Sequence, residues 1–142
     1  MRYFSANVYS VVVHDDAEDD LSAIFELDED VGATLATFLE LLEEGNQDLL
    51  DRLTQRGFTN HNSPEFNVDE WQKAKSLKLN LWRIRLLSVD VASNYRIIYA
   101  FHAAEFRYYV LAILERSFNY EISDPRVKRI IEVYDALDIP RR

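Results

Sequence analysis

The chain has 142 residues, a formal net charge of −9, 48% apolar residues and 29% charged residues. This profile is typical of a single soluble globular domain. The absence of cysteine excludes disulfide frameworks, thiol catalysis and cysteine-based zinc sites. No apolar run approaches the roughly 20 residues of a membrane helix. The first residues, Met1 to Phe4, lack the apolar core of a signal peptide, so we expect a cytoplasmic protein with no membrane contact.

The net charge hides a division between the two halves of the chain. Residues 1–71 hold 3 basic and 17 acidic residues, a net charge of −14. Residues 72–142 hold 13 basic and 8 acidic residues, a net charge of +5. Such asymmetry indicates either contact with nucleic acid or a complementary partner, or simply one solvated acidic face.

In the first half, residues 1–14 are rich in Tyr, Phe and Val and predict a strand. Residues 16–57 predict an acidic helical segment, with Asp15 and Asp16 offering the N-cap. Breaks at residues 28–30 and 45–46 divide this segment into helices. Residues 58–70 are polar and mixed, which predicts a loop, and a helical turn is expected over 69–75.

The second half changes character. Three β-rich runs, over residues 79–88, 95–103 and 106–114, are joined by short links. Short links predict an antiparallel meander over residues 79–116. A final helix is expected over residues 124–137, with Asp124 as its N-cap and Pro125 at its first position.

The order of these elements predicts the fold class. Strands and helices are segregated rather than alternating, and neither an internal repeat nor a linker divides the chain. We therefore expect a single α+β domain over residues 1–142. Its antiparallel sheet should have about four strands, with the N-terminal helices packed on one face and a C-terminal helix.

Arginines recur on the predicted meander. Arg83 and Arg85 are two residues apart on one strand, so their side chains leave the same face, opposite to Trp82, Ile84 and Leu86. Arg96 begins the next strand and Arg116 closes the third, while Lys73, Lys75 and Lys78 lead into the sheet. Guanidinium groups and aromatic rings on a β-surface suit a phosphodiester and an unpaired base. The alternative is an ordinary exposed strand face.

Other catalytic constellations are weak. His14, His61 and His102 lack metal-ligand spacing, which favours surface or capping roles. The carboxylates of residues 15–20 lack the glycine and the alternation of an EF-hand loop. The sequence has no phosphate-binding or dinucleotide glycine motif. We therefore expect no metal and no cofactor.

Several segments together resemble a known family. They are Leu81-Trp82-Arg83-Ile84-Arg85, the run Asn94-Tyr95-Arg96-Ile97-Ile98-Tyr99-Ala100-Phe101, the run from Leu111 to Tyr120, and Arg129-Ile130-Ile131 followed by Tyr134 to Leu137. This combination resembles the RelE/ParE superfamily of toxins from type II toxin–antitoxin systems. The resemblance covers about residues 78–137 and implies a RelE-like fold.

For the RelE-like branch, the resemblance implies an mRNA endonuclease that acts in the ribosomal A site and inhibits translation. The ribose 2′-hydroxyl attacks the adjacent phosphorus without a metal, giving a 2′,3′-cyclic phosphate and a free 5′-hydroxyl. By position, the catalytic residues would be Arg83, Arg85, Arg96, Arg116 and Tyr120. The RNA-binding residues would be Lys73, Lys75 and Lys78. The expected partners are a cognate antitoxin, the ribosome and mRNA.

The sequence departs from the family pattern in two respects. RelE-like nucleases often have lysines where this chain has Arg83 and Arg85, and arginine effectively cannot accept a proton. The proton acceptor therefore stays open among Tyr120, Glu115 and Lys78. The acidic helical half is also bulkier than in compact members. Two alternative functions stay open: a ParE-like inhibitor of DNA gyrase, and a non-enzymatic binding module with the same fold.

Overall fold

The computed structural model describes residues 8–87, 91–117 and 121–141. Its elements lie along the chain in the following order: β1 (Ser10–Val13), α1 (Asp15–Leu27), α2 (Glu29–Glu43), α3 (Gln47–Leu50), β2 (Thr59–Asn60), β3 (Phe66–Glu70), α4 (Gln72–Lys75), β4 (Leu81–Leu86), the 3₁₀ turn η1 (Ala92–Asn94), β5 (Tyr95–His102), β6 (Arg107–Glu115) and α5 (Pro125–Ala136). The fold is therefore α+β, as the sequence predicts. Among these residues, no helix is long and apolar enough to span a bilayer.

The sheet differs from the prediction in strand number and in direction. Within the described ranges it has six strands in the order β1-β6-β5-β4-β3-β2, rather than about four. Strands β2 to β6 pair antiparallel, and β4, β5 and β6 form the expected meander. Strand β1 pairs parallel to β6, so the expectation of a purely antiparallel sheet is wrong at this edge. Parallel neighbours need a long crossover, and the rest of the chain between them provides it.

Strands β2 and β3 occupy the segment that the sequence predicts as a loop. Asn, Asp and Pro are poor strand formers, so composition argues against a strand here. Phe66, Val68 and Glu70 nevertheless alternate as buried residues on β3, while Asn67 and Asp69 are partly exposed. Pairing with β4 overrides the weak local propensity, because it satisfies the backbone groups of β3 along a strand that is already buried.

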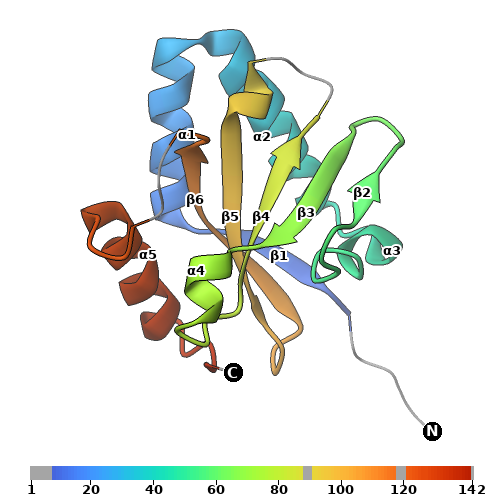
Figure 1. The fold of residues 1–142 in the computed structure, drawn as a ribbon. Helices are drawn as coiled ribbons and strands as arrows, with labels where there is room; N and C mark the ends of the chain where they lie inside the picture. Colours follow the sequence, from blue (N-terminus) through green and yellow to red (C-terminus); the bar gives the residue numbers. More distant parts are fainter. Residues whose placement is uncertain (1–7, 88–90, 118–120, 142) are drawn as a thin grey trace, which may run out of the picture.

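The sheet separates two apolar layers (Figure 1). The first layer joins buried residues of α1 and α2 to Trp82, Ile84 and Leu86 on β4, which confirms the face predicted for these three side chains. The second layer joins α4 and α5 to the opposite face of the meander, through residues that include Ile98, Ala112 and Val127. The N-terminal helices thus cover one face as predicted, and α5 covers part of the other.

The helix starts follow local capping chemistry. The side chain of His14 caps α1 by accepting a hydrogen bond from the backbone N–H of Asp16 at 3.0 Å, so the prediction of Asp15 or Asp16 as the cap is wrong by one or two positions. Asp28 caps α2, at the predicted break between the helices. Asp124 caps α5 and Pro125 occupies its first turn, as predicted.

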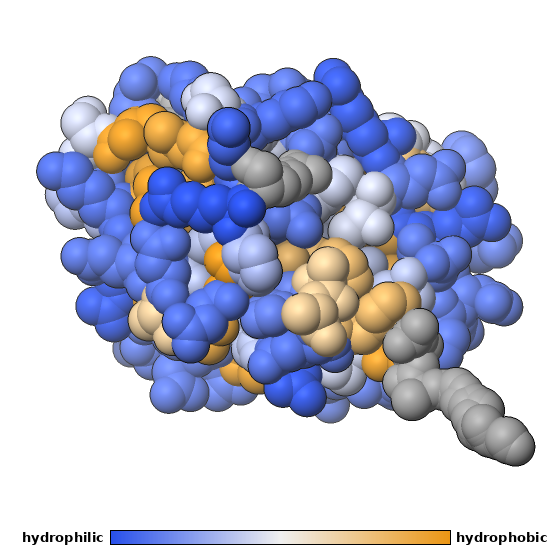
Figure 2. All heavy atoms as spheres, turned by 90° about the horizontal axis from the view of Figure 1, so that it is seen from below, coloured by the Kyte–Doolittle hydropathy of each residue, from blue (hydrophilic) through white to orange (hydrophobic). Residues whose placement is uncertain are grey.

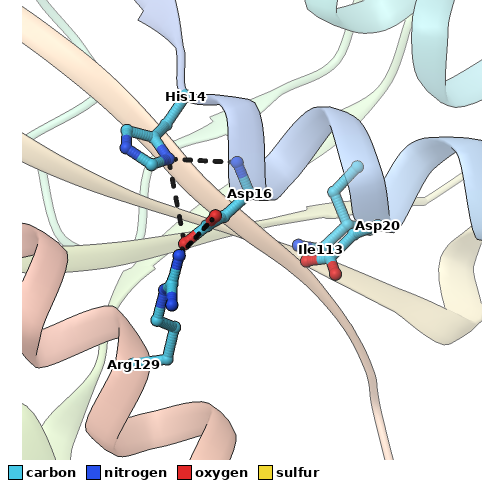
Figure 3. A network of polar contacts seen from close by, with 5 residues as sticks. All are labelled: His14, Asp16, Asp20, Ile113 and Arg129. Carbon is cyan, nitrogen blue, oxygen red and sulfur yellow. Dashed lines mark hydrogen bonds and ion pairs between the residues drawn. The ribbon is translucent and has the colours of Figure 1, made fainter.

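A polar network closes the edge of β6 beyond the end of β1 (Figure 3). There the carboxylate of Asp20 accepts a hydrogen bond from the backbone N–H of Ile113 at 2.9 Å, in place of a strand partner. Burial raises the pKa of Asp20, against the opposing effect of that hydrogen bond. Arg129 of α5 donates to both carboxylate oxygens of Asp16 at 2.8 and 3.2 Å, which lowers the pKa of Asp16 and ties α5 to α1.

Replacement of Asp20 should lower the stability of the protein. Asp20→Ala leaves the N–H of Ile113 without its acceptor, so we expect the free energy of unfolding to fall by about 1–3 kcal/mol. Asp20→Asn keeps an oxygen acceptor and should lose much less. Urea unfolding followed by circular dichroism measures both, with the exposed neighbour Asp19→Ala as control. Equal stability of Asp20→Ala and the control would contradict this role.

Candidate anion-binding site

On the face of the meander that packs against α4 and α5, apolar residues give way to arginine toward one end of the sheet. On β4, buried Leu81 is followed on this face by Arg83 and Arg85. On β5, which runs in the opposite direction, Arg96 precedes buried Ile98. After β6, Arg116 follows Leu114 on the same face by strand alternation. Because neighbouring strands alternate in direction, these sequence positions bring the arginines to the same end.

Three of these arginines line one pocket of about 330 Å³. Arg83 lies on β4, Arg96 lies on β5 and Arg116 directly follows β6, while Lys73 comes from the adjacent helix α4. The remaining lining residues are Glu70, Trp71 and Gln72. Four of the eight residues that the sequence assigns to catalysis or RNA binding are thus brought together in one depression.

The lining of this arginine pocket carries four cationic side chains and one carboxylate, in a protein of net charge −9. Internal acids offset part of this charge: Asp69 lies 3.7 Å from Arg83, and Glu121 lies 2.6 Å from Lys73. Arg96 donates hydrogen bonds to the backbone carbonyls of Ser93 and Tyr95 at 2.8 and 3.1 Å. These backbone hydrogen bonds fix the position of the Arg96 guanidinium at the pocket.

Glu70 is the charged lining residue that the sequence did not predict, and Trp71 and Gln72 were not predicted either. It ends β3 and is only 7% exposed, and its carboxylate lies 3.7 Å from the Nζ of Lys75. A buried carboxylate beside a cationic pocket is a group that can accept a proton. On β3, Glu70 alternates with Phe66 and Val68 and pairs with Trp82, whereas Asp69 pairs with Arg83. Glu70 therefore joins the lining from the end of β3 and not from the strand face that carries Arg83.

The other predicted site residues that the structure describes are not part of the pocket lining. Arg85 is on the same face of β4 as Arg83 but is not part of the lining. Lys75 pairs with Glu70, and Lys78 is exposed in the turn after α4 with a φ of 63°. Glu115 is exposed at the end of β6. Tyr120 lies outside the described residues, so its predicted role stays a prediction.

The described histidines act as local caps or lie on the surface. His14 caps α1, and the Nδ1 of His102 accepts a hydrogen bond from the N–H of Glu105 at 3.4 Å in the β5–β6 turn. His61 is exposed. In the part of the chain that the structure describes, no group of three or more His, Asp or Glu side chains is arranged to hold a metal ion.

A larger groove lies on the other side of the sheet. It has a volume of about 940 Å³ and runs between α2 and the segment Ser63–Glu65, with Phe38 and Leu41 in its lining. The four charged residues that line it are all acidic: Glu40, Glu43, Glu44 and Glu65. Negative charge opposes binding of a phosphate, so size alone does not make this groove the anion site.

The base of the molecule carries no single large apolar patch in the view of Figure 2. Seen from below, apolar residues form separate patches within a mostly hydrophilic surface (Figure 2). At the β5–β6 end, the rings of Phe101 and Phe106 pack against Tyr9, with centroid distances of 6.0 and 4.3 Å. These rings therefore pack against one another within the fold. The arginine pocket therefore remains the concavity with the most distinctive chemistry.

In comparisons with known proteins, no protein-family model, no curated protein and no solved structure matches this chain.

Inorganic phosphate should bind to the arginine pocket. We expect a phosphate titration followed by NMR to shift the side-chain N–H signals of Arg83, Arg96 and Arg116 together. Arg116→Gln should weaken binding roughly tenfold, because a hydrogen bond to a charged group contributes about 1.5–3 kcal/mol. Arg141→Gln is the control, because Arg141 pairs with Asp135 and is not part of the pocket. Shifts spread over all surface arginines would contradict a specific site.

Proposed function

We propose that the protein is a RelE-type toxin: a metal-independent mRNA endonuclease that acts on ribosome-bound mRNA and inhibits translation. The observation that carries this proposal is the convergence of Lys73, Arg83, Arg96 and Arg116 on one pocket. The resemblance assigns these four positions to RNA binding and catalysis, and they lie far apart along the chain. An ordinary exposed strand face would not require arginines from three strands and a lysine from a helix to meet.

The order of the elements supports the same proposal. The resemblance implies a strand, a helical segment, a basic meander and a final helix, and β1, α1 to α3, β4 to β6 and α5 follow in that order. The insertion of β2 and β3 leaves the order of the meander unchanged. The fold alone does not specify a function, so the charge of the pocket remains the stronger argument.

In this proposal the pocket residues supply the catalytic chemistry. The 2′-hydroxyl attacks the neighbouring phosphorus, and the guanidiniums of Arg83, Arg96 and Arg116 stabilise the negative charge that develops on the phosphoryl oxygens. The 2′-hydroxyl proton passes to the carboxylate of Glu70, and the departing 5′-oxygen takes up a proton from solvent. The products are a 2′,3′-cyclic phosphate and a 5′-hydroxyl. Glu70 thus replaces Tyr120, Glu115 and Lys78 as the proposed proton acceptor.

Loss of a pocket arginine should reduce cleavage. Arg96→Ala and Arg116→Ala should each lower the cleavage rate on the order of 100-fold, because each removes a preorganised donor to the transition state. Purified protein is incubated with mRNA, with and without ribosomes, and the new 5′ ends are mapped. The proposal expects cuts within codons that depend on ribosomes. Arg141→Ala should cleave like the unmodified protein, and a fully active Arg96→Ala/Arg116→Ala variant would refute the proposal.

Glu70 should matter for the chemical step rather than for binding. Glu70→Gln preserves size and removes the proton acceptor, so we expect kcat to fall about 10²- to 10⁴-fold with little change in KM. Single-turnover cleavage on saturating ribosome–mRNA complex measures this step. Glu115→Gln is the matched control, since Glu115 is exposed and is not part of the pocket lining. An equal decrease of kcat in Glu70→Gln and Glu115→Gln would show that Glu70 is not the specific proton acceptor.

The same experiments separate the alternative functions. A gyrase inhibitor would cause DNA breaks in growing cells and would leave mRNA intact. A non-enzymatic module would cause neither effect. If the nuclease proposal holds, a cognate antitoxin is the expected partner, and it would need to prevent mRNA from reaching the arginine pocket.

A further inference from the structure

The groove of about 940 Å³ between α2 and residues 63–65 carries negative charge on both of its sides. Its volume lies within the range of about 300–1,000 Å³ that ligand-binding pockets occupy. No lysine or arginine is found among the described residues that line it, and the sequence has neither between Arg2 and Arg52. The charged lining residues are Glu40, Glu43 and Glu44 at the end of α2, and Glu65 on the facing segment.

These four glutamates have no counter-charge inside the fold. In the ranges that the structure describes, none of them forms an ion pair, whereas acids elsewhere do, as Asp16 does with Arg129. Glu40 and Glu44 are four residues apart on α2, a spacing at which like charges repel. They also lie at the negative end of the helix dipole, and the last turn of α2 has no basic residue. A cationic ligand would relieve this repulsion.

The floor of the groove is apolar and fixed. Phe38 and Leu86 are each only 3% exposed and belong to the first apolar layer, and the ring of Phe38 packs edge-to-face on Phe66 with a centroid distance of 5.1 Å. Leu41 is partly buried against the same layer. The groove thus offers an apolar floor between acidic rims, which suits a ligand with one apolar and one cationic face.

The facing wall excludes an extended peptide that pairs as a strand. The side-chain amide of Asn60 donates hydrogen bonds to the backbone carbonyls of Asn62 and Pro64 at 3.1 and 2.9 Å. The carbonyl of Glu65 accepts from the N–H of Leu87 at 3.0 Å. Because these backbone groups are used within the fold, a ligand must dock through side chains, as an amphipathic helix does in a groove.

The described part of this chain supplies no such helix to a second copy. Helix α5 is the longer of the two described helices that carry basic residues, but its apolar residues Val127, Ile130 and Tyr134 are buried in the second layer. Helix α4 has only four residues, of which Ala74 is buried. A ligand with a free apolar face and cationic flanks therefore comes from another protein.

We propose that this groove is the docking site for a cationic amphipathic helix of a partner protein. The apolar side chains of the partner helix lie against Leu41 and the accessible edges of Phe38 and Leu86. Its lysines or arginines pair with the unpaired carboxylates, Glu40 and Glu44 among them. The inference does not depend on the proposed function. The groove and the arginine pocket lie on opposite sides of the sheet, so the bound helix leaves the pocket uncovered.

The test uses a synthetic peptide of leucine and lysine, about 14 residues or four helical turns long, with its leucines on one face. An isomer with the leucines spread around the helix has the same charge and no apolar face. NMR titration of the whole protein measures both affinities and locates the binding. We expect the first peptide to bind about tenfold more tightly, with shifts in residues 37–44 and 63–65 and none at Arg96 or Arg116.

A pair of charge variants links the binding to the groove. Glu40→Gln/Glu44→Gln should weaken binding of the first peptide about fivefold, because ion pairs at the rim are lost. The same variant should raise the midpoint of thermal unfolding of the free protein by about 2–4 °C, because the repulsion is relieved. The control Glu18→Gln/Glu26→Gln changes the net charge equally on α1, outside the lining, and should bind like the unmodified protein.

The outcomes that overturn the proposal are distinct. Equal affinity of the two peptides, or equal weakening by the two double variants, would show a general attraction between cations and an acidic protein and would refute the groove. Sedimentation velocity tests a second copy: a dimer that Glu40→Gln/Glu44→Gln dissociates would show that another copy of the chain covers the groove. None of these measurements involves RNA, so their results are separate from those on the proposed nuclease.

Discussion

Burial of the meander on both faces is the constraint from which the rest of the structure follows. Strands β4, β5 and β6 pack against α1 and α2 on one side and against α4 and α5 on the other. A strand covered on both faces must be apolar on both. The cover on the second face does not extend over the whole sheet, and toward one end the same face carries arginines instead of Leu, Ile and Ala. The arginine pocket therefore lies where the second layer of packing ends.

The sheet also separates charges of opposite sign. The acidic residues that line the groove on α2 lie on the first-layer side of the sheet, whereas the arginine pocket lies on the second face. A uniform distribution of the net charge of −9 would repel RNA. Three arginines and a lysine nevertheless line one pocket in spite of the negative total.

Much of this arrangement could be predicted from the sequence. The meander, the face occupied by Trp82, Ile84 and Leu86, and the cap of α5 all follow from short-range patterns. The convergence of arginines follows from strand alternation together with short links. The histidine cap of α1, the parallel pairing of the predicted first strand and the strand β3 were not predicted. In each of these cases the local sequence is compatible with more than one structure. A hydrogen bond or a pairing with another segment selects the one that forms.

The amino-acid sequence by itself determined the periodicity of the main elements and the positions of the arginines, because these depend on neighbours a few residues away. Only the tertiary structure decided that β3 extends the sheet and brings Glu70 to the pocket and Asn67 beside Arg85. The physical reason is that β3 is a weak strand former, and the backbone of β4 supplies the hydrogen bonds that make it a strand. The place of Glu70 at the pocket depends on that pairing, which no local pattern specifies.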